Sequence, residues 1–152
     1  MKLIIFILLA SFFFPLMLIG EDNHPQVSLE TEEDIAYLND IIRDGYRGKY
    51  RNAERDLEEY LEEFPHSERA LGGMIMVQRI SGDYQGALKH TALWRSLNPE
   101  SVEALLAEVE LWMMTGRYER ASTCMKEAES LEDSLGVQTL KARVLHETGK
   151  RQ

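Results

Sequence analysis

A six-residue pattern, Gly-x-Tyr-x-x-Ala, occurs three times in this chain at intervals of 34 residues. The copies begin at Gly48, Gly82 and Gly116. A fixed period of this length is typical of a helical hairpin that is repeated and stacked, because each hairpin buries its apolar face only against its neighbours. Each glycine is expected to end a helix, since it adopts positive φ at low cost. The period therefore predicts an elongated helical array, and it makes recruitment of a partner protein the leading functional hypothesis.

Apolar residues recur at helical spacing between these turns, and turn residues separate the segments. Ser67, Ser101 and Ser134 each precede an odd-numbered helix, where a hydroxyl accepts hydrogen bonds from the first free amides. Thr31 and Asp34 resemble a capping box at the start of the first helix. No alternating strand pattern and no glycine-rich phosphate loop competes with an all-α fold. The sequence predicts seven helices, at residues 32–46, 49–63, 68–80, 84–96, 102–114, 118–130 and 136–148.

These positions resemble the tetratricopeptide repeat, a helix-turn-helix unit of about 34 residues. Pro65 and Pro99 lie 34 residues apart at the position that closes such a unit, and Asp133 takes that place in the next one. The resemblance covers about residues 34–149 and implies an all-α solenoid of antiparallel helix hairpins, with three repeats plus one further helix. The implied repeats are residues 34–67, 68–101 and 102–134, followed by a last helix at 135–149.

The chain departs from the family at the eighth position of each repeat, which is usually small. Ile41, Ile75 and Val109 occupy this position in the three full repeats, and only Ala142 conforms. We expect the bulky residues to change the spacing between helices without changing the fold class. The aromatic residues that face the following hairpin, Tyr60 and Trp94, are expected to belong to the core.

The last predicted helix has an apolar face that extends around more than half of its circumference. The face is formed by Val137, Leu140, Ala142, Val144 and Leu145. A terminal helix is expected to be polar on its outer side. This end is therefore expected to self-associate, to contact a partner, or to belong to a longer chain.

The first twenty residues differ from the remainder, because one cation precedes the uncharged apolar stretch at residues 3–19. This pattern is typical of a secretory signal peptide or of an N-terminal membrane anchor. Pro15 weakens a continuous membrane helix, whereas Leu18 only half satisfies the small-x-small rule for cleavage after residue 20. Both alternatives stay open, and both predict an extracytoplasmic protein that is periplasmic, secreted or membrane-anchored. Residues 21–33 are predicted to form an acidic linker.

Composition argues against several classes of function. The chain has 17 Lys and Arg against 26 Asp and Glu, a formal net charge of −9, and such a surface repels the phosphates of nucleic acids. Cys124 has no second cysteine to pair with and is expected to be a small buried residue. The four histidines are His24, His66, His90 and His146, and their spacing forms no metal-ligand pair. The sequence therefore predicts no enzyme, no metal site and no cofactor.

In the family that the chain resembles, the first helix of each repeat lines a concave groove that holds ligands. Carried over by register, the resemblance places on this wall Leu38, Ile42, Arg69, Met76, Arg79, Leu106, Glu110, Met113, Arg143 and His146. Cations, pliable methionines and one carboxylate suit a peptide of apolar and acidic character. An ordinary solvated groove is the alternative. A subclass that binds chaperone carboxylate ends uses a clamp of Lys and Asn, and this clamp is absent, because Gly72 and three apolar residues occupy its positions.

The leading hypothesis is an exported, non-enzymatic scaffold that binds a protein or peptide partner in this groove. The alternative is a structural component that forms a homo-oligomer through residues 136–148, with the apolar segment 3–19 as a membrane tether or a second assembly element. A third interpretation is a fragment of a longer repeat protein.

Overall fold

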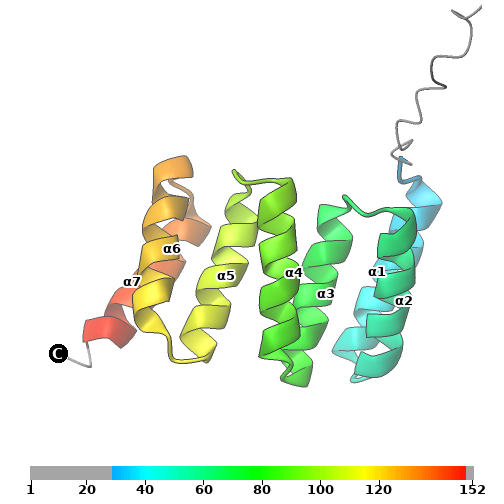
Figure 1. Cartoon of the computed structure of the whole chain (residues 1–152), viewed down its shortest axis with the longest axis horizontal. Coiled ribbons are helices and arrows are strands. Elements are labelled where there is room, and N and C mark those ends of the chain that lie inside the picture. Colours follow the sequence, from blue (N-terminus) through cyan, green and yellow to red (C-terminus); the bar gives the residue numbers. More distant parts are fainter. Residues whose placement is uncertain (1–28, 150–152) are drawn as a thin grey trace, which may run out of the picture.

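The computed structural model describes residues 29–149, which form seven α-helices joined by short turns (Figure 1). Every helix predicted from the sequence is present, and its ends lie within one residue of the predicted ones. The predictions for residues 1–20 and for most of the acidic linker lie outside the described residues. The helices are α1 (Glu32–Tyr46), α2 (Tyr50–Glu63), α3 (Glu68–Ser81), α4 (Tyr84–Leu97), α5 (Val102–Met114), α6 (Tyr118–Leu131) and α7 (Leu135–Gly149).

The helices stack in the order of the chain, and helices far apart in sequence do not touch within the described part (Figure 1). Each helix packs against the next one, from α1 on α2 to α6 on α7. The odd-numbered helices also lie close to one another along their backbones, α1 to α3, α3 to α5 and α5 to α7, whereas within residues 29–149 the backbones of the even-numbered helices stay farther apart. The result is an all-α solenoid whose odd-numbered helices share one side, which we call the inner face. Among residues 29–149, none of the helices combines the length and the hydropathy that crossing a membrane requires.

Helix ends follow the side chains that the sequence places there. Ser67 Oγ and Ser101 Oγ each accept a hydrogen bond of 3.2 Å from the amide three residues later, and Ser134 Oγ accepts one of 3.4 Å. Both halves of the capping box at Thr31 are present. Gly82, with φ of 91°, ends α3 in the left-handed region, where an L-residue costs about 1–2 kcal/mol. Local chemistry therefore explains why the helix boundaries could be predicted closely.

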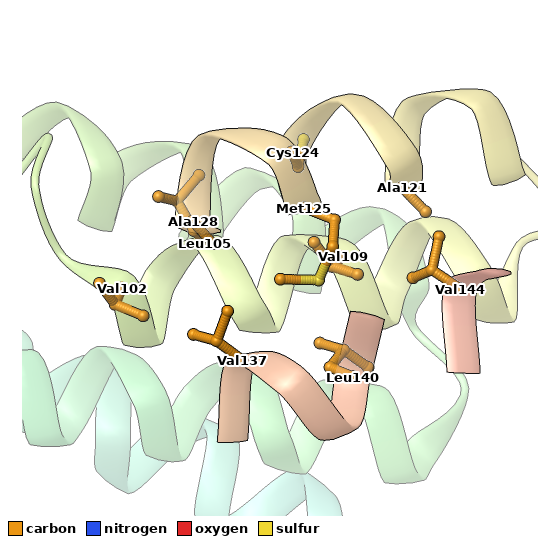
Figure 2. Close-up of a cluster of buried hydrophobic side chains, with 10 residues drawn as sticks. All are labelled: Val102, Leu105, Val109, Ala121, Cys124, Met125, Ala128, Val137, Leu140 and Val144. Atoms are coloured by element: carbon orange, nitrogen blue, oxygen red, sulfur yellow. The ribbon is translucent and has the colours of Figure 1, made fainter. Parts of the chain in front are cut away.

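Three separate clusters of buried side chains replace a single central core. The first lies among α1, α2 and α3, the second among α3, α4 and α5, and the third among α5, α6 and α7. Figure 2 shows the third cluster, in which residues of α5 and α6 meet three side chains of α7. Tyr60 and Trp94 are 5% and 7% exposed, as predicted for core aromatic residues. Each cluster joins one hairpin to the first helix of the next, so stability is distributed along the row.

Close helix packing depends on two glycines. A Cβ at Gly73 of α3 would lie 2.8 Å from Ile42 Cγ1 of α1, and a Cβ at Gly45 would lie 2.6 Å from Val77 Cγ2. Real Cβ atoms do not approach that closely, so α1 and α3 depend on a missing side chain at both points. The eighth-position isoleucine of α1, Ile41, is meanwhile 4% exposed in the first cluster. Small residues are thus used at positions other than the one that the resemblance implies.

Candidate functional site on the inner face

The ten residues predicted to line a groove come from α1, α3, α5 and α7, the helices of the inner face. The prediction that Leu38 lines the groove is wrong. Its side chain is 0% exposed within the first cluster and offers no surface to a ligand. Its neighbours in that cluster are buried side chains of α2 and α3. Four others are half-buried and pack beside the first or third cluster, namely Ile42, Met76, Leu106 and Met113. They keep part of an apolar surface open on the inner face.

One carboxylate joins two arginines across three helices of the inner face. Glu110 of α5 accepts a hydrogen bond from Arg79 of α3 through Oε2, and Arg143 Nη1 of α7 lies 3.3 Å from Oε1. The side chains of Glu110 and Arg79 are about one-third exposed, whereas that of Arg143 is 57% exposed. Solvent screens such a network, so it contributes little to stability. It leaves one positive charge in excess, on the more accessible Arg143.

Arg69 lies at the opposite end of α3 from Arg79. Its Nη1 donates to Asn39 Oδ1 of α1 at 3.2 Å, which is a neutral partner. Within the described part of the chain, no carboxylate lies within ion-pair distance of Arg69. The acid next to Asn39 in the sequence, Asp40, pairs instead with Arg43 of α1 at 2.6 Å. Arg69 is exposed. The inner face therefore offers a second guanidinium to an anionic group.

Two shallow depressions lie between α5 and α7, and both are lined by Arg143. One, of about 470 Å³, also contains Leu106 and Glu110, and the other, of about 280 Å³, contains Met113 and His146. Five of the predicted groove residues therefore lie together at this end of the inner face. The predicted residues of α1 and of the first half of α3 do not line either depression. The structure adds residues that the sequence analysis missed: Met114, Tyr118, Leu135, Gly136, Thr139, Leu140 and Glu147.

Met114 belongs to a second set that the sequence analysis missed. Tyr46, Ile80 and Met114 occupy the same position in successive odd-numbered helices, 34 residues apart. They are 67%, 41% and 49% exposed, so one large apolar side chain per repeat stands open near the hairpin turns. Comparing the repeats position by position finds the three residues in the sequence. Their exposure is visible only in the structure, because large apolar side chains are usually buried.

A polar cluster joins α4, α5 and α6. Arg95 of α4 donates to Glu108 Oε2 at 2.7 Å and also pairs with Glu127 of α6. Trp112 Nε1 donates to the other oxygen of Glu108 at 3.0 Å, while Arg120 stacks over the Trp112 ring at 4.9 Å. A depression of about 370 Å³ beside this cluster is lined by Glu108, Trp112, Glu119, Arg120, Thr123 and Cys124. Arg95 is paired with both Glu108 and Glu127, so this cluster links three helices and has a structural role.

Cys124 is a buried thiol in this cluster, 8% exposed. Burial, and then the nearby Glu108 carboxylate, raises the pKa of the Cys124 thiol to about 11. Because the thiolate is the nucleophile, this cysteine is poorly suited to catalysis. The prediction of a small buried residue at Cys124 is confirmed.

Cys124 also makes stability depend on pH in the alkaline range. Its folded pKa lies above its ordinary value of 9.0, so the stability it contributes is fully present below about pH 9 and is lost as the pH rises towards 11. We expect the free energy of unfolding to fall across this window more steeply in the wild-type chain than in a Cys124→Ala variant. Urea titrations at several pH values would measure the difference, and identical slopes would contradict the assignment.

Among residues 29–149, no three His, Cys, Asp or Glu side chains are grouped in a way that could hold a metal ion. Comparison with protein-family models and with curated proteins found no match for this chain. The tetratricopeptide resemblance therefore stays a prediction based on the spacing of glycine, tyrosine, alanine and proline.

Proposed function

We propose that this protein is an extracytoplasmic, non-enzymatic scaffold of the tetratricopeptide type that holds a peptide segment of a partner protein against its inner face. The bridge from Arg79 through Glu110 to Arg143 carries the proposal. One carboxylate already sits between two guanidiniums there, so the surface has the chemistry to accept a further carboxylate from outside. Arg143 is the arginine that a ligand would engage, since it is the more exposed of the two.

Apolar side chains beside the bridge define the rest of the ligand. Met113 and Leu106 border Arg143 in the two depressions, and methionine adapts its shape to different partners. Met76 is half-buried on α3, the helix of Arg79. The favoured ligand is therefore a peptide with an acidic residue flanked by apolar residues. The extracytoplasmic location rests on the apolar stretch at residues 3–19 and on the acidic residues that follow it.

Selection of a random peptide library on the full chain in detergent micelles would test this function. We expect the enriched peptides to share an acidic residue next to one or two apolar ones. Their affinity is expected to fall at least tenfold, about 1.4 kcal/mol, in an Arg79→Glu/Met76→Glu double variant and in Arg143→Glu.

The matched control is Arg55→Glu on α2, whose side chain is 63% exposed and pairs only with acids of its own helix. This variant changes the net charge by the same amount as Arg143→Glu but lies on an even-numbered helix. Equal affinity for wild type, Arg143→Glu and Arg55→Glu would remove the inner face from the proposed function. An equal loss in both arginine variants would mean that net charge alone attracts the peptides.

A further inference from the structure

The three hairpin turns lie along one long edge of the solenoid, the lower edge in Figure 1, whereas the other turns and the start of α1 lie along the opposite edge. We call the first the turn edge and the second the acidic edge. The turn edge comprises residues 46–52, 80–86 and 114–120, and the acidic edge comprises residues 29–34, 62–68, 96–102 and 130–136. A helix of 14 residues such as α3 holds the two edges about 21 Å apart.

The two edges differ in charge. The acidic edge contains ten Asp and Glu residues and no Lys or Arg, whereas the turn edge contains five Lys and Arg residues against two acids. Two of the five cations, Arg47 and Lys49, share the carboxylate of Asp44 in the last turn of α1. The formal net charge of −9 is therefore unevenly distributed, and the turn edge keeps an excess of positive charge.

Three arginines of the turn edge remain available to an anion from outside. Arg51, Arg117 and Arg120 are exposed, and within residues 29–149 none of them lies within ion-pair distance of a carboxylate. The guanidiniums of Arg117 and Arg120 instead stack over the Trp112 ring, 5.3 Å and 4.9 Å from its centroid. Stacking orients a guanidinium but leaves its N–H groups able to donate to phosphate oxygens. The turn edge therefore offers unpaired cations to phosphate groups.

Each hairpin turn also presents one exposed apolar side chain. These residues are Tyr46, Ile80 and Met114, and a half-buried tyrosine follows each of them four residues later, at the first position of the next helix. Apolar side chains among arginines and tyrosines suit the boundary between lipid headgroups and acyl chains. Because the three turns form a row, they can touch a flat surface at the same time (Figure 1).

The charge pattern determines which edge can face an anionic membrane. The acidic edge also exposes apolar side chains, with Leu97 38% and Leu131 43% exposed, but the surrounding acids repel anionic lipids. Such repulsion is screened over a Debye length of about 8 Å at physiological salt. When the turn edge touches the lipid surface, the acidic edge lies about 21 Å away, more than two Debye lengths. The negative net charge therefore does not prevent the contact.

We propose that the turn edge docks on the surface of a membrane that contains anionic lipids, with its unpaired arginines on the headgroup phosphates and its exposed apolar side chains among the acyl chains. The helices then point away from the bilayer, and the acidic edge is the part farthest from it. This contact is independent of the peptide proposed for the inner face. Met114 also lines the smaller depression of that face, so the reporter in the test is placed at Ile80.

A fluorescent reporter in the full chain tests both the contact and its orientation. In a Cys124→Ala background, Ile80→Cys is labelled with a dye whose emission rises in an apolar medium. Leu97→Cys on the acidic edge is the matched control. Each protein is inserted from dilute detergent into preformed vesicles of phosphatidylcholine, alone or with one-third phosphatidylglycerol. At residue 80 we expect about threefold higher emission in the mixed vesicles than in the neutral ones, and at residue 97 no difference.

Charge variants separate the arginines from the effect of net charge. Arg51→Glu/Arg117→Glu is expected to lower the rise at residue 80 at least threefold, because it reverses two charges at the lipid surface. Lys89→Glu/Lys126→Glu, in the middle of α4 and α6, changes the net charge equally and is expected to keep the rise. Helix content by circular dichroism confirms that both variants fold.

Four results would each overturn the proposal. The first is no rise at residue 80 in the mixed vesicles, as expected if the turn edge binds an acidic protein instead of lipid. The second is an equal rise at residues 80 and 97, which would mean that the solenoid has no fixed orientation. The third is the same emission in neutral and mixed vesicles, and the fourth is an equal loss in both double variants.

Discussion

Replacing Gly73 with alanine is expected to lower the free energy of unfolding by about 1–2 kcal/mol, whereas the same change at the neighbouring Gly72 is expected to raise it by about 0.5–1 kcal/mol. Both substitutions gain the helix propensity of alanine in the middle of α3. They differ in the space that a Cβ finds. At Gly73 it meets Ile42 at 2.8 Å, and at Gly72 it meets the Trp94 ring at an ordinary 3.5 Å.

Urea unfolding of the two variants measures this difference. Because Gly72 and Gly73 are adjacent in the middle of one helix, the gain in helix propensity is matched, and the sign of the change reports on the approach of α1 to α3. Stabilisation by Gly73→Ala would mean that Ile42 moves aside freely and that the two helices are not held close at this point.

Removing the guanidinium of Arg95 is expected to cost about 2–3 kcal/mol of unfolding free energy. This side chain reaches from α4 to Glu108 of α5 and Glu127 of α6, so Arg95→Ala leaves two carboxylates without their cation. The Glu108 side chain is only 18% exposed. Uncompensated burial of a charge costs about 3–5 kcal/mol, and partial exposure at this site lowers the expected value.

Arg55→Ala on α2 is the matched control. Arg55 also contacts a carboxylate, Asp56, at 2.7 Å, but its side chain is 63% exposed. Its loss is expected to leave the free energy of unfolding nearly unchanged, because solvent screens an ion pair as exposed as this one. Thermal unfolding of both variants, each compared with wild type, decides the question. Equal effects would show that the cluster around Arg95 is as weakly coupled as an exposed ion pair.

Helix positions could be predicted from the sequence because they depend on local chemistry. Serine caps such as Ser101 and turn glycines such as Gly82 act on the backbone within a few residues. The repeat period adds support, because the same boundary residues recur in the other repeats. The all-α solenoid followed from the same evidence. No part of that inference required knowledge of which side chains touch across helices.

The inner face was predicted less well because exposure there depends on tertiary packing. Leu38 shares its repeat position with Leu106, yet Leu38 is fully buried in the first cluster whereas Leu106 is only half-buried. The joint pairing of Arg79 and Arg143 with Glu110 brings together three helices, and register alone does not specify which charges meet. Neither the repeat pattern nor the packing of the helices identifies the partner, since recognition also depends on groups of the partner itself.

The division of the buried side chains into three clusters determines how the chain unfolds locally. Each cluster depends on neighbouring helices only, so opening at one end does not require the other end to open. α7 is held on one side, and we expect its backbone amides to exchange with solvent before those of α3, which has partners on both sides. Anything that covers the open side of α7 would slow this fraying and lengthen the time that the terminal helix stays folded.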